Sequence, residues 1–463
     1  MQNRSESTME WLEPRLCFSG AADLTHVVAE ALSDPKAIPK GLSLGNSAIF
    51  TGSLLVPGSV VDIYSADSDR WSTHRLRGGS VMARAGNKVL LTGNGQHPRL
   101  VEFYDVKSKA WSLQTQARPH SWYVSVSAGD KAFFVDGSDN AYYEARTGRW
   151  TRFSLPFYFT PHSGVAIAGV PYFVDSSGDV RSYNTSTKQW RDVVKTGLGS
   201  PQMVAVGTNL LLTGFTPGNA PTLTVSAALF DTVAEKSLTI AAPPHRVDVV
   251  STVVGSKAIF AGASDNIVGV FDLATGTWTS TTLSQPRFTM AAATAGNKAL
   301  FAGGSVGHDP NLLKTVDIFT DTFPSPVLSG GLTGNIGHRN QVTIINTGDA
   351  DLAGPYGIQL YASLDRTLNG AILIGTRGVT APLPAGASAT FGVRTILPKD
   401  TPAGTYHLLA AISDGTGHLT PIAAEDATFR VGRKQVAAPA NTRSAKSMAG
   451  AFTRASHSAR QWT

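Results

Sequence analysis

Histidines in a shared local context are the residues of this chain best suited to chemistry. The segments RPHSW, TPHSG and PPHRV each place a Pro-His pair before an apolar stretch, and they contain His120, His162 and His245. Imidazole binds transition metals when neutral and anions when protonated. Three such side chains could form a metal or anion site. The alternative, which we favour, is that repeated loops carry similar polar residues, so we expect no bound metal and no cofactor.

Further polar residues occur in short Gly- or Pro-containing segments. GNGQHPR contains His97, GGSVGHDP contains His308, and QPRFT contains Arg287 in the context of the Pro-His pairs. Aspartates gather in comparable segments, at positions Asp136, Asp139, Asp175, Asp179 and Asp265. Such carboxylates could bind calcium or act as an acid–base pair. Asp, Gly, Ser and Asn are also the residues that tight hairpins require, and we favour this turn interpretation.

The elements that carry these residues recur along the chain. A short apolar strand followed by a turn appears seven times, as NSAIFTG, NKVLLTG, DKAFFVD, VPYFVD, TNLLLTG, SKAIFAG and NKALFAG. From Asn46 to Asn297 the chain runs 251 residues in six steps, about 42 residues per step. Such a period means that each unit is one supersecondary element that buries its faces against its neighbours.

The second half of each unit carries paired aromatic residues. An aromatic residue and a Trp stand seven positions apart in five units, at Tyr64 and Trp71, Tyr104 and Trp111, Tyr143 and Trp150, Tyr183 and Trp190, and Phe271 and Trp278. The fifth unit has Phe230 with Ser237, and the seventh has Phe319 with Phe323 nearby. We expect four strands per unit, with the Trp filling the space between neighbouring units.

Seven units of four strands predict an all-β fold, a seven-bladed β-propeller whose blades cover one another. In antiparallel blades, the connections between second and third strands emerge on the same face as the connections from one blade to the next. We expect that face to hold the candidate binding residues, which are His97, His120, His162, His245, Arg287 and His308.

The repeated unit resembles the kelch repeat. The resemblance rests on the aromatic-x6-Trp spacing, on the Lys-x-x-Phe strand and on the Gly that follows it; FAGGS keeps the full Gly pair at Gly303 and Gly304. It covers residues 37–327 and implies a kelch-type β-propeller. Kelch propellers serve both as enzymes and as binding scaffolds, so this fold alone names no function.

A second all-β domain is expected after the propeller. PSPVLSGGLTG is rich in turn residues and predicts a linker, which we assign to residues 328–334. Beyond it, short alternating strands such as QVTIINTG, YGIQLYAS and TYHLLAAIS predict an immunoglobulin-like β-sandwich. The segments INTGDADLAGPYGIQLYASLDRTLNG and PAGTYHLLA resemble a CARDB domain over residues 335–431, an Ig-like module of bacterial extracellular proteins.

The two ends of the chain differ from the repeats. WLEPRLCFSG, within an N-terminal segment of residues 1–36, resembles the LEPR-type segment of exported bacterial proteins, which implies a targeting role. The same segment lacks the apolar stretch of an ordinary secretory signal. It contains Cys17, the only cysteine, so an intrachain disulfide is excluded.

The basic character of the chain resides in its C-terminal tail. Residues 432–463 contain six Lys or Arg and no acid, which accounts for the formal net charge of +6. We therefore predict a basic, disordered tail and no nucleic-acid partner. No apolar run approaches the roughly 20 residues that a membrane span requires, so we also predict no transmembrane segment.

These features favour a non-catalytic binding or scaffold protein at the bacterial cell surface or exterior, a monomer whose propeller face loops contact a protein or a glycan. A kelch propeller followed by an Ig-like domain resembles galactose oxidase, but that chemistry needs a propeller Cys, and residues 37–327 contain none. A kelch-type enzyme similar to sugar-acid epimerases stays open as the alternative. It would use arginines such as Arg84, Arg118 and Arg287 with a carboxylate at the channel mouth.

Overall fold

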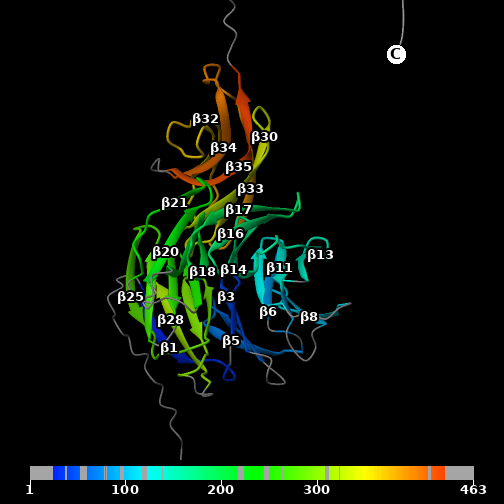
Figure 1. The fold of residues 1–463 in the computed structure, drawn as a ribbon, viewed down its shortest axis with the longest axis vertical. Helices are drawn as coiled ribbons and strands as arrows, with labels where there is room; N and C mark the ends of the chain where they lie inside the picture. The colour runs from blue at the N-terminus through cyan, green and yellow to red at the C-terminus, as the bar shows by residue number, and fades with distance from the viewer. Residues whose placement is uncertain are drawn as a thin grey trace, which may run out of the picture.

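The computed structural model describes residues 24–432 apart from 37–38, 53–59, 78, 80, 94–98, 117–121, 138, 217–223, 244–249, 263–264, 308–311, 323 and 415–418. Every regular element in the described part is a β-strand (Figure 1). The all-β prediction is therefore confirmed. Within these residues no helix is long and apolar enough to cross a membrane.

Seven antiparallel four-stranded sheets follow one another along most of the chain. Sheet 1 comprises β2 (Lys40–Ser43), β3 (Ser47–Thr51), β4 (Val60–Ser65) and β5 (Arg70–Arg75). Sheet 2 comprises β6 (Val81–Ala85), β7 (Lys88–Thr92), β8 (Leu100–Asp105) and β9 (Trp111–Thr115). Sheet 3 comprises β10 (Val124–Ala128), β11 (Lys131–Val135), β12 (Asn140–Glu144) and β13 (Arg149–Phe153). Sheet 4 comprises β14 (Pro161–Ile167), β15 (Val170–Asp175), β16 (Asp179–Asn184) and β17 (Gln189–Lys195).

The remaining three sheets also have four strands each. Sheet 5 comprises β18 (Gly199–Val206), β19 (Asn209–Thr216), β20 (Thr224–Asp231) and β21 (Lys236–Leu238). Sheet 6 comprises β22 (Val250–Val254), β23 (Lys257–Ala261), β24 (Ile267–Asp272) and β25 (Thr277–Thr282). Sheet 7 comprises β26 (Ala291–Ala295), β27 (Lys298–Ala302), β28 (Thr315–Asp321) and β1 (Leu24–Glu30).

The first strands of these sheets bring them into a propeller-like arrangement. Each first strand contacts the first strand of the next sheet, from β2 to β26, and β26 also contacts β2. Second and third strands such as β3 and β4 are apolar and buried, because neighbouring sheets cover both of their faces. Fourth strands such as β5 are largely exposed.

The Trp residues of the repeat pack between sheets as the sequence predicts. Trp71 lies directly opposite Tyr64 in the β4–β5 register, with ring centroids 5.1 Å apart. Trp190 of sheet 4 also reaches back to sheet 3, where its Nε1 donates to the carbonyl of Ser154 at 2.8 Å. These aromatic residues are therefore part of the core and of the contact between neighbouring sheets.

Sheet 7 corrects the predicted N-terminal boundary. We predicted a separate segment over residues 1–36, but β1 (Leu24–Glu30) forms the outer strand of sheet 7, paired with β28. The seventh unit has no Trp seven positions after Phe319, and its fourth strand comes from the start of the chain instead. His26 lies opposite Phe319 in the register and stacks on it, with centroids 4.4 Å apart.

Residues after the seven sheets form a second unit of two packed sheets, here called the C-terminal unit. One sheet has the order β29 (Leu328–Thr333), β30 (Arg339–Asn346) and β33 (Ser388–Arg394). The other has the order β32 (Ile372–Val379), β31 (Tyr356–Ser363), β34 (Gly404–Ser413) and β35 (Leu419–Val431). Their inward side chains, Ile344, Ile358 and Leu408 among them, share one buried core.

The segment predicted as a linker, residues 328–334, is largely strand β29. Its two glycines suggested a turn, but Gly330 serves close packing instead. A Cβ at Gly330 would lie 2.4 Å from the carbonyl oxygen of Thr343 and 2.9 Å from the Cδ1 of Ile422. Glycine is thus required here because two strands approach each other closely.

The C-terminal unit is fastened to sheet 5. Val233, in the β20–β21 connection, packs with Tyr361 and Leu409 of the C-terminal unit. Arg366 donates from Nε to the carbonyl of Val233 at 2.9 Å and pairs with Glu235 at 2.6 Å. In Figure 1 the C-terminal unit therefore lies beyond β21, at one end of the seven sheets.

Candidate functional site

The two faces of the seven-sheet ring are unequal. The C-terminal unit contacts the connections between third and fourth strands, at Val233 and Glu235. It also reaches a connection between first and second strands, where a Cβ at Gly207 would lie 3.2 Å from Val327. Connections between second and third strands, and those between sheets, emerge at the other ends of the strands. We call the face they form the open face.

A central cavity of about 770 Å³ runs between the first strands of all seven sheets. Its described lining is mostly Ser, Thr, Val, Ala and Met, with Lys40, Tyr123 and His162 as the ionisable side chains. Burial lowers the pKa of Lys40 below its ordinary value. Burial and the nearby charge of Asp136 raise the pKa of Tyr123. No carboxylate is among the described lining residues, and Asp136, whose charge acts on Tyr123, lies outside that lining.

The structure separates the two predicted site residues that it describes. His162 is exposed at the start of β14 and lines the central cavity. Arg287 is completely buried and donates to the carbonyls of Gly303 (3.2 Å) and Thr315 (2.9 Å). Its guanidinium also pairs with Asp317. Arg287 is therefore not available on the surface. The remaining candidates lie outside the described residues: His97, His120, His245 and His308.

Arg84, an arginine considered for carbohydrate chemistry, also has a local role. Its Nε donates to the carbonyl of Gly86 at 2.6 Å, in the β6–β7 connection away from the open face. Arg84 and Arg287 thus have different partners in different sheets, and Arg118 lies outside the described residues.

The acidic segments act as turns where they are described. Asp175 Oδ1 accepts the backbone N–H groups of Ser177 and Asp179, each at 3.0 Å. Asp265 Oδ1 accepts the N–H of Ile267 at 3.0 Å. Within the described residues, no group of three or more His, Cys, Asp or Glu is arranged to hold a metal ion.

Two fully exposed aromatic rings stand on the connection between sheets 3 and 4. Phe157 is 82% exposed and Tyr158 is 91% exposed, and their ring centroids lie 4.0 Å apart. The next residue, Phe159, is buried against Trp190 at 5.7 Å and anchors the connection. Burial of Phe159 thus holds the connection in place, while the rings of Phe157 and Tyr158 project into solvent.

The turn that presents these rings is strained. Phe159 N–H donates to the carbonyl of Pro156 at 3.2 Å, closing a four-residue β-turn. Tyr158 occupies its third position with φ +60°, where Gly or Asn is normally found. A left-handed conformation costs a side-chain-bearing residue about 1–2 kcal/mol. Tyr158 shares this positive φ with other turn residues of the sheets, such as Lys109 and Lys188, but its side chain is the most exposed large hydrophobic one in the described residues.

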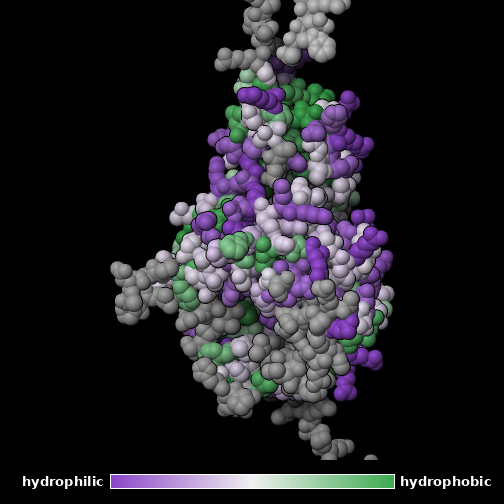
Figure 2. Space-filling view, turned by 45° about the vertical axis from the view of Figure 1, so that its right-hand side comes forward, coloured by the Kyte–Doolittle hydropathy of each residue, from purple (hydrophilic) through white to green (hydrophobic). Residues whose placement is uncertain are grey.

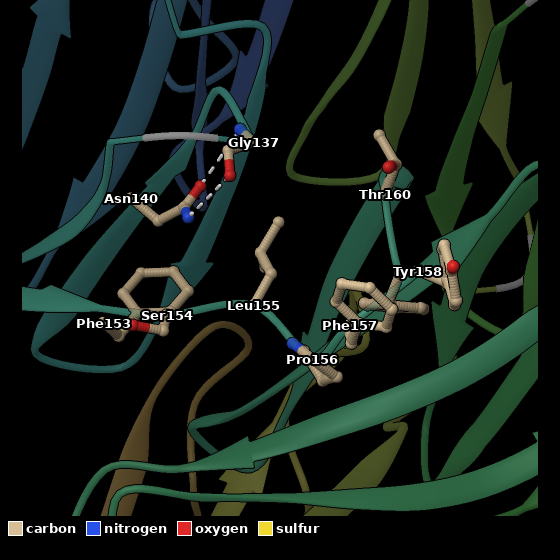
Figure 3. A pocket seen from close by; sticks show the side chains of 10 residues that line it. Gly137, Asn140, Phe153, Ser154, Leu155, Pro156, Phe157, Tyr158 and Thr160 are labelled. Atoms are coloured by element: carbon tan, nitrogen blue, oxygen red, sulfur yellow. Dashed lines mark hydrogen bonds between the residues drawn. The ribbon is translucent and has the colours of Figure 1, made fainter.

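A shallow hollow of about 400 Å³ lies beside the two rings. Figure 3 shows Gly137 and Asn140 on one side of it and Phe157 and Tyr158 on the other. Gly137 comes from the β11–β12 connection, Asn140 is the first residue of β12, and the rings come from the β13–β14 connection. The two types of connection therefore share one face here, as the strand order predicts.

The hollow is polar without being charged. Exposed Ser154 and Thr160 border it, while Asn140 is buried and accepts the backbone N–H groups of Asp136 and Gly137 at 3.2 Å. No Asp, Glu, Lys, Arg or His side chain is among its described lining residues. The Tyr123 hydroxyl lies 3.6 Å from the Cβ position of Gly137, so the hollow adjoins the central cavity that Tyr123 lines.

Sequence reasoning missed both the exposed rings and a set of buried carboxylates. Phe157 and Tyr158 stand among apolar residues, and composition alone does not distinguish exposed rings from core. The carboxylates did leave a signal, because Asp62, Glu102 and Asp317 each stand two residues before the aromatic residue of the third strand, in VDIY, VEFY and VDIF.

Comparisons with known proteins assign neither a family nor a function to this chain. No family model matches the sequence, and no curated protein matches it. A solved structure of U3-55K has a TM-score of 0.45 at 9% identity, covering 65% of this chain and 99% of the other. A chain in a structure of S. cerevisiae Dbp5 bound to Nup159, Gle1, IP6 and ADP has a TM-score of 0.41 at 8% identity, covering 66% and 98%. At these values neither likeness bears on function.

Proposed function

We propose that this chain is a non-catalytic binding or scaffold protein of the bacterial cell surface or exterior. In this proposal the seven-sheet ring is a seven-bladed kelch-type β-propeller, and the C-terminal unit is a CARDB-type, immunoglobulin-like sandwich that acts as a spacer. The open face is the binding surface for a protein or a glycan.

The observation that carries the proposal is the exposed aromatic pair on the open face. Phe157 and Tyr158 are presented outward by a turn that Tyr158 destabilises. The C-terminal unit contacts the opposite ends of the strands, so it leaves this pair accessible. Large exposed aromatic side chains with a strained backbone are typical of binding surfaces.

Photo-crosslinking of the full chain tests this proposal. A photoreactive amino acid replaces the exposed Ser176 in the β15–β16 connection on the open face, or Lys188 in the β16–β17 connection on the opposite face. The full chain is then incubated with isolated bacterial envelope material. We expect covalent adducts from the Ser176 position and few from the Lys188 position. Equal adducts from both positions, or none, would contradict the proposal.

Protease treatment of intact cells tests the proposed location. We expect protease added outside cells that produce the full chain to digest it, while a cytoplasmic marker protein stays intact. Protection of the chain until the cells are broken would place it inside and contradict the proposed location.

A further inference from the structure

The exposed aromatic pair and the neighbouring hollow have the chemistry of a saccharide subsite. We propose that Phe157, Tyr158 and the hollow bind one or two sugar units of a neutral glycan, an inference that rests on the proposed binding role of the open face. A sugar ring has an apolar face of C–H groups and a rim of hydroxyls. It therefore requires an aromatic surface beside uncharged hydrogen-bonding groups.

Each requirement is met by named residues. The rings of Phe157 and Tyr158 lie 4.0 Å apart and provide the aromatic surface. Ser154 and Thr160 line the hollow, and their hydroxyls are uncharged donors and acceptors. The hollow, at about 400 Å³, falls in the size range of small-molecule sites.

The charge of the lining decides between neutral and acidic sugars. An acidic sugar needs a cation to replace the water that its carboxylate loses on binding. The described lining of the hollow offers none. Arg152 is paired with Asp139 at 3.1 Å, and Arg181, whose guanidinium lies 4.8 Å from the ring of Phe159, is paired with Asp192 at 2.6 Å. The site therefore favours an uncharged saccharide.

The size of the feature favours a glycan over a protein. A stable protein interface usually buries about 800 Å² on each partner and includes Arg or Trp anchors. The pair and the hollow are a compact feature of ten residues, suited to a ligand of a few units. The hollow adjoins Tyr123 and the central cavity, so a longer chain of sugars has a path toward the mouth of that cavity.

The positive φ of Tyr158 allows a test in which loss of binding can be separated from loss of stability. The full chain is applied to an array of neutral hexasaccharides of glucose, mannose, galactose and N-acetylglucosamine, together with acidic hexasaccharides of glucuronate and galacturonate. The affinity for the best neutral hexasaccharide is then measured by titration for the full chain and for three variants: Phe157→Ala, Tyr158→Gly and Lys188→Gly. Lys188 also has a positive φ, +58°, but stands in a turn on the opposite face.

We expect the full chain to bind at least one neutral hexasaccharide. Phe157→Ala and Tyr158→Gly should each weaken this binding about tenfold or more. Tyr158→Gly should leave the melting temperature equal or higher, because Gly relieves the left-handed strain. Lys188→Gly should relieve the same kind of strain and leave the affinity unchanged. Loss of binding together with gain of stability excludes misfolding as the cause.

Three outcomes would overturn the inference: binding to no neutral hexasaccharide, binding only to the acidic ones, or binding that the Phe157 and Tyr158 variants leave unchanged. The crosslinking experiment then separates this failure from failure of the proposed function. Open-face adducts that contain a protein and no sugar would leave the binding role standing and reject the glycan. Absence of open-face adducts would reject both.

Discussion

Three buried carboxylates fasten consecutive sheets to one another. Asp62, Glu102 and Asp317 occupy the same position of the third strand in sheets 1, 2 and 7. Each accepts a backbone N–H from the connection that enters its sheet: Asp62 from Ser33 (3.0 Å), Glu102 from Arg77, and Asp317 from Ser284 (2.8 Å). Each also pairs with a basic side chain, respectively Lys36 (2.8 Å), His74 (3.2 Å) and Arg287.

Asp317 should be the most costly of these to remove. Its side chain and that of Arg287 are both fully buried, so Asp317→Ala leaves a buried guanidinium without its charge partner. We expect a loss of about 3–5 kcal/mol in the free energy of unfolding, measured by urea denaturation. Asp192→Ala is the control, because the exposed Asp192 pairs with Arg181 at 2.6 Å and should contribute less than about 1 kcal/mol. Similar losses in the two variants would contradict the role of Asp317.

The contribution of Asp317 should also depend on pH. Burial by itself raises the pKa of Asp317, but the hydrogen bond with His26 and the charge of Arg287 outweigh it and hold that pKa below its ordinary value. A lowered pKa stabilises the fold above about pH 4, the unfolded value, and the gain is lost as the pH falls through the folded value. Urea midpoints measured from pH 6 to pH 2 should therefore converge for the original chain and Asp317→Asn. A constant difference across this range would contradict the assignment.

The strands show where sequence reasoning succeeds. The apolar second strand, and the aromatic residue seven positions before a Trp, predicted the four-stranded antiparallel units, because packing between neighbouring sheets demands those residues at those positions. The outer strand of sheet 7 was not predicted, since His26 replaces the Trp there and its partner Asp317 is 291 residues away. Sequence periodicity detects neighbours along the chain and does not detect such distant pairing.

At β29 the sequence prediction was wrong in another way. The glycines of residues 328–334 predicted a linker, but the structure has a strand there. The matched pair Gly330 and Gly331 tests the physical explanation. Gly330→Ala brings a Cβ within 2.4 Å of the Thr343 carbonyl oxygen and should cost about 1–3 kcal/mol in the free energy of unfolding. Gly331 has no atom within 4 Å of its Cβ position, so Gly331→Ala should change stability by less than about 0.5 kcal/mol. Equal effects in thermal or urea unfolding would show that close packing is not the reason for Gly330.

The candidate site was only partly predictable. The strand order predicted that two kinds of connection share a face, and the hollow beside Phe157 confirms this. The exposure of Phe157 and Tyr158 could not be predicted, because it depends on Phe159 being drawn into the core and on the left-handed turn at Tyr158. Arg287 was placed on the face by its repeat position, yet the buried Asp317 draws it inward.

The whole molecule has an acidic contact at its junction. Asp349 of the C-terminal unit and Asp321 of sheet 7 meet over Gly255, where a Cβ would lie 2.9 Å from Asp349 Oδ1 and 3.0 Å from Asp321 Oδ2. Lys257 neutralises Asp321 at 2.9 Å. Burial and, to a smaller extent, the charge of Asp321 raise the pKa of Asp349. The ionised form of Asp349 is therefore less favourable at the junction than in water.

Replacement of the Asp349 carboxylate by a neutral amide should stabilise the fold at neutral pH. A raised pKa means that the fold favours the protonated form, and this advantage is lost as the pH rises through the folded value. In the original chain the N–H of Ser325 donates to Asp349 Oδ1 at 2.8 Å. The variant Asp349→Asn keeps an oxygen that can accept this hydrogen bond but removes the negative charge. We expect a higher melting temperature at pH 7 and no gain near pH 3. Asp351→Asn, an exposed acceptor on the same connection, should change little at either pH. A lower melting temperature for Asp349→Asn at pH 7 would contradict this account.

The pairing of β1 with β28 has a consequence for biosynthesis. Strand β1 meets its partner β28 only after about 290 further residues have been synthesised, which takes about 15 to 60 s at ordinary elongation rates. During that interval β1 is without its partner strand, and unpaired strand edges invite aggregation. A cell that makes this protein thus has reason to shelter the nascent chain until translation passes Asp321.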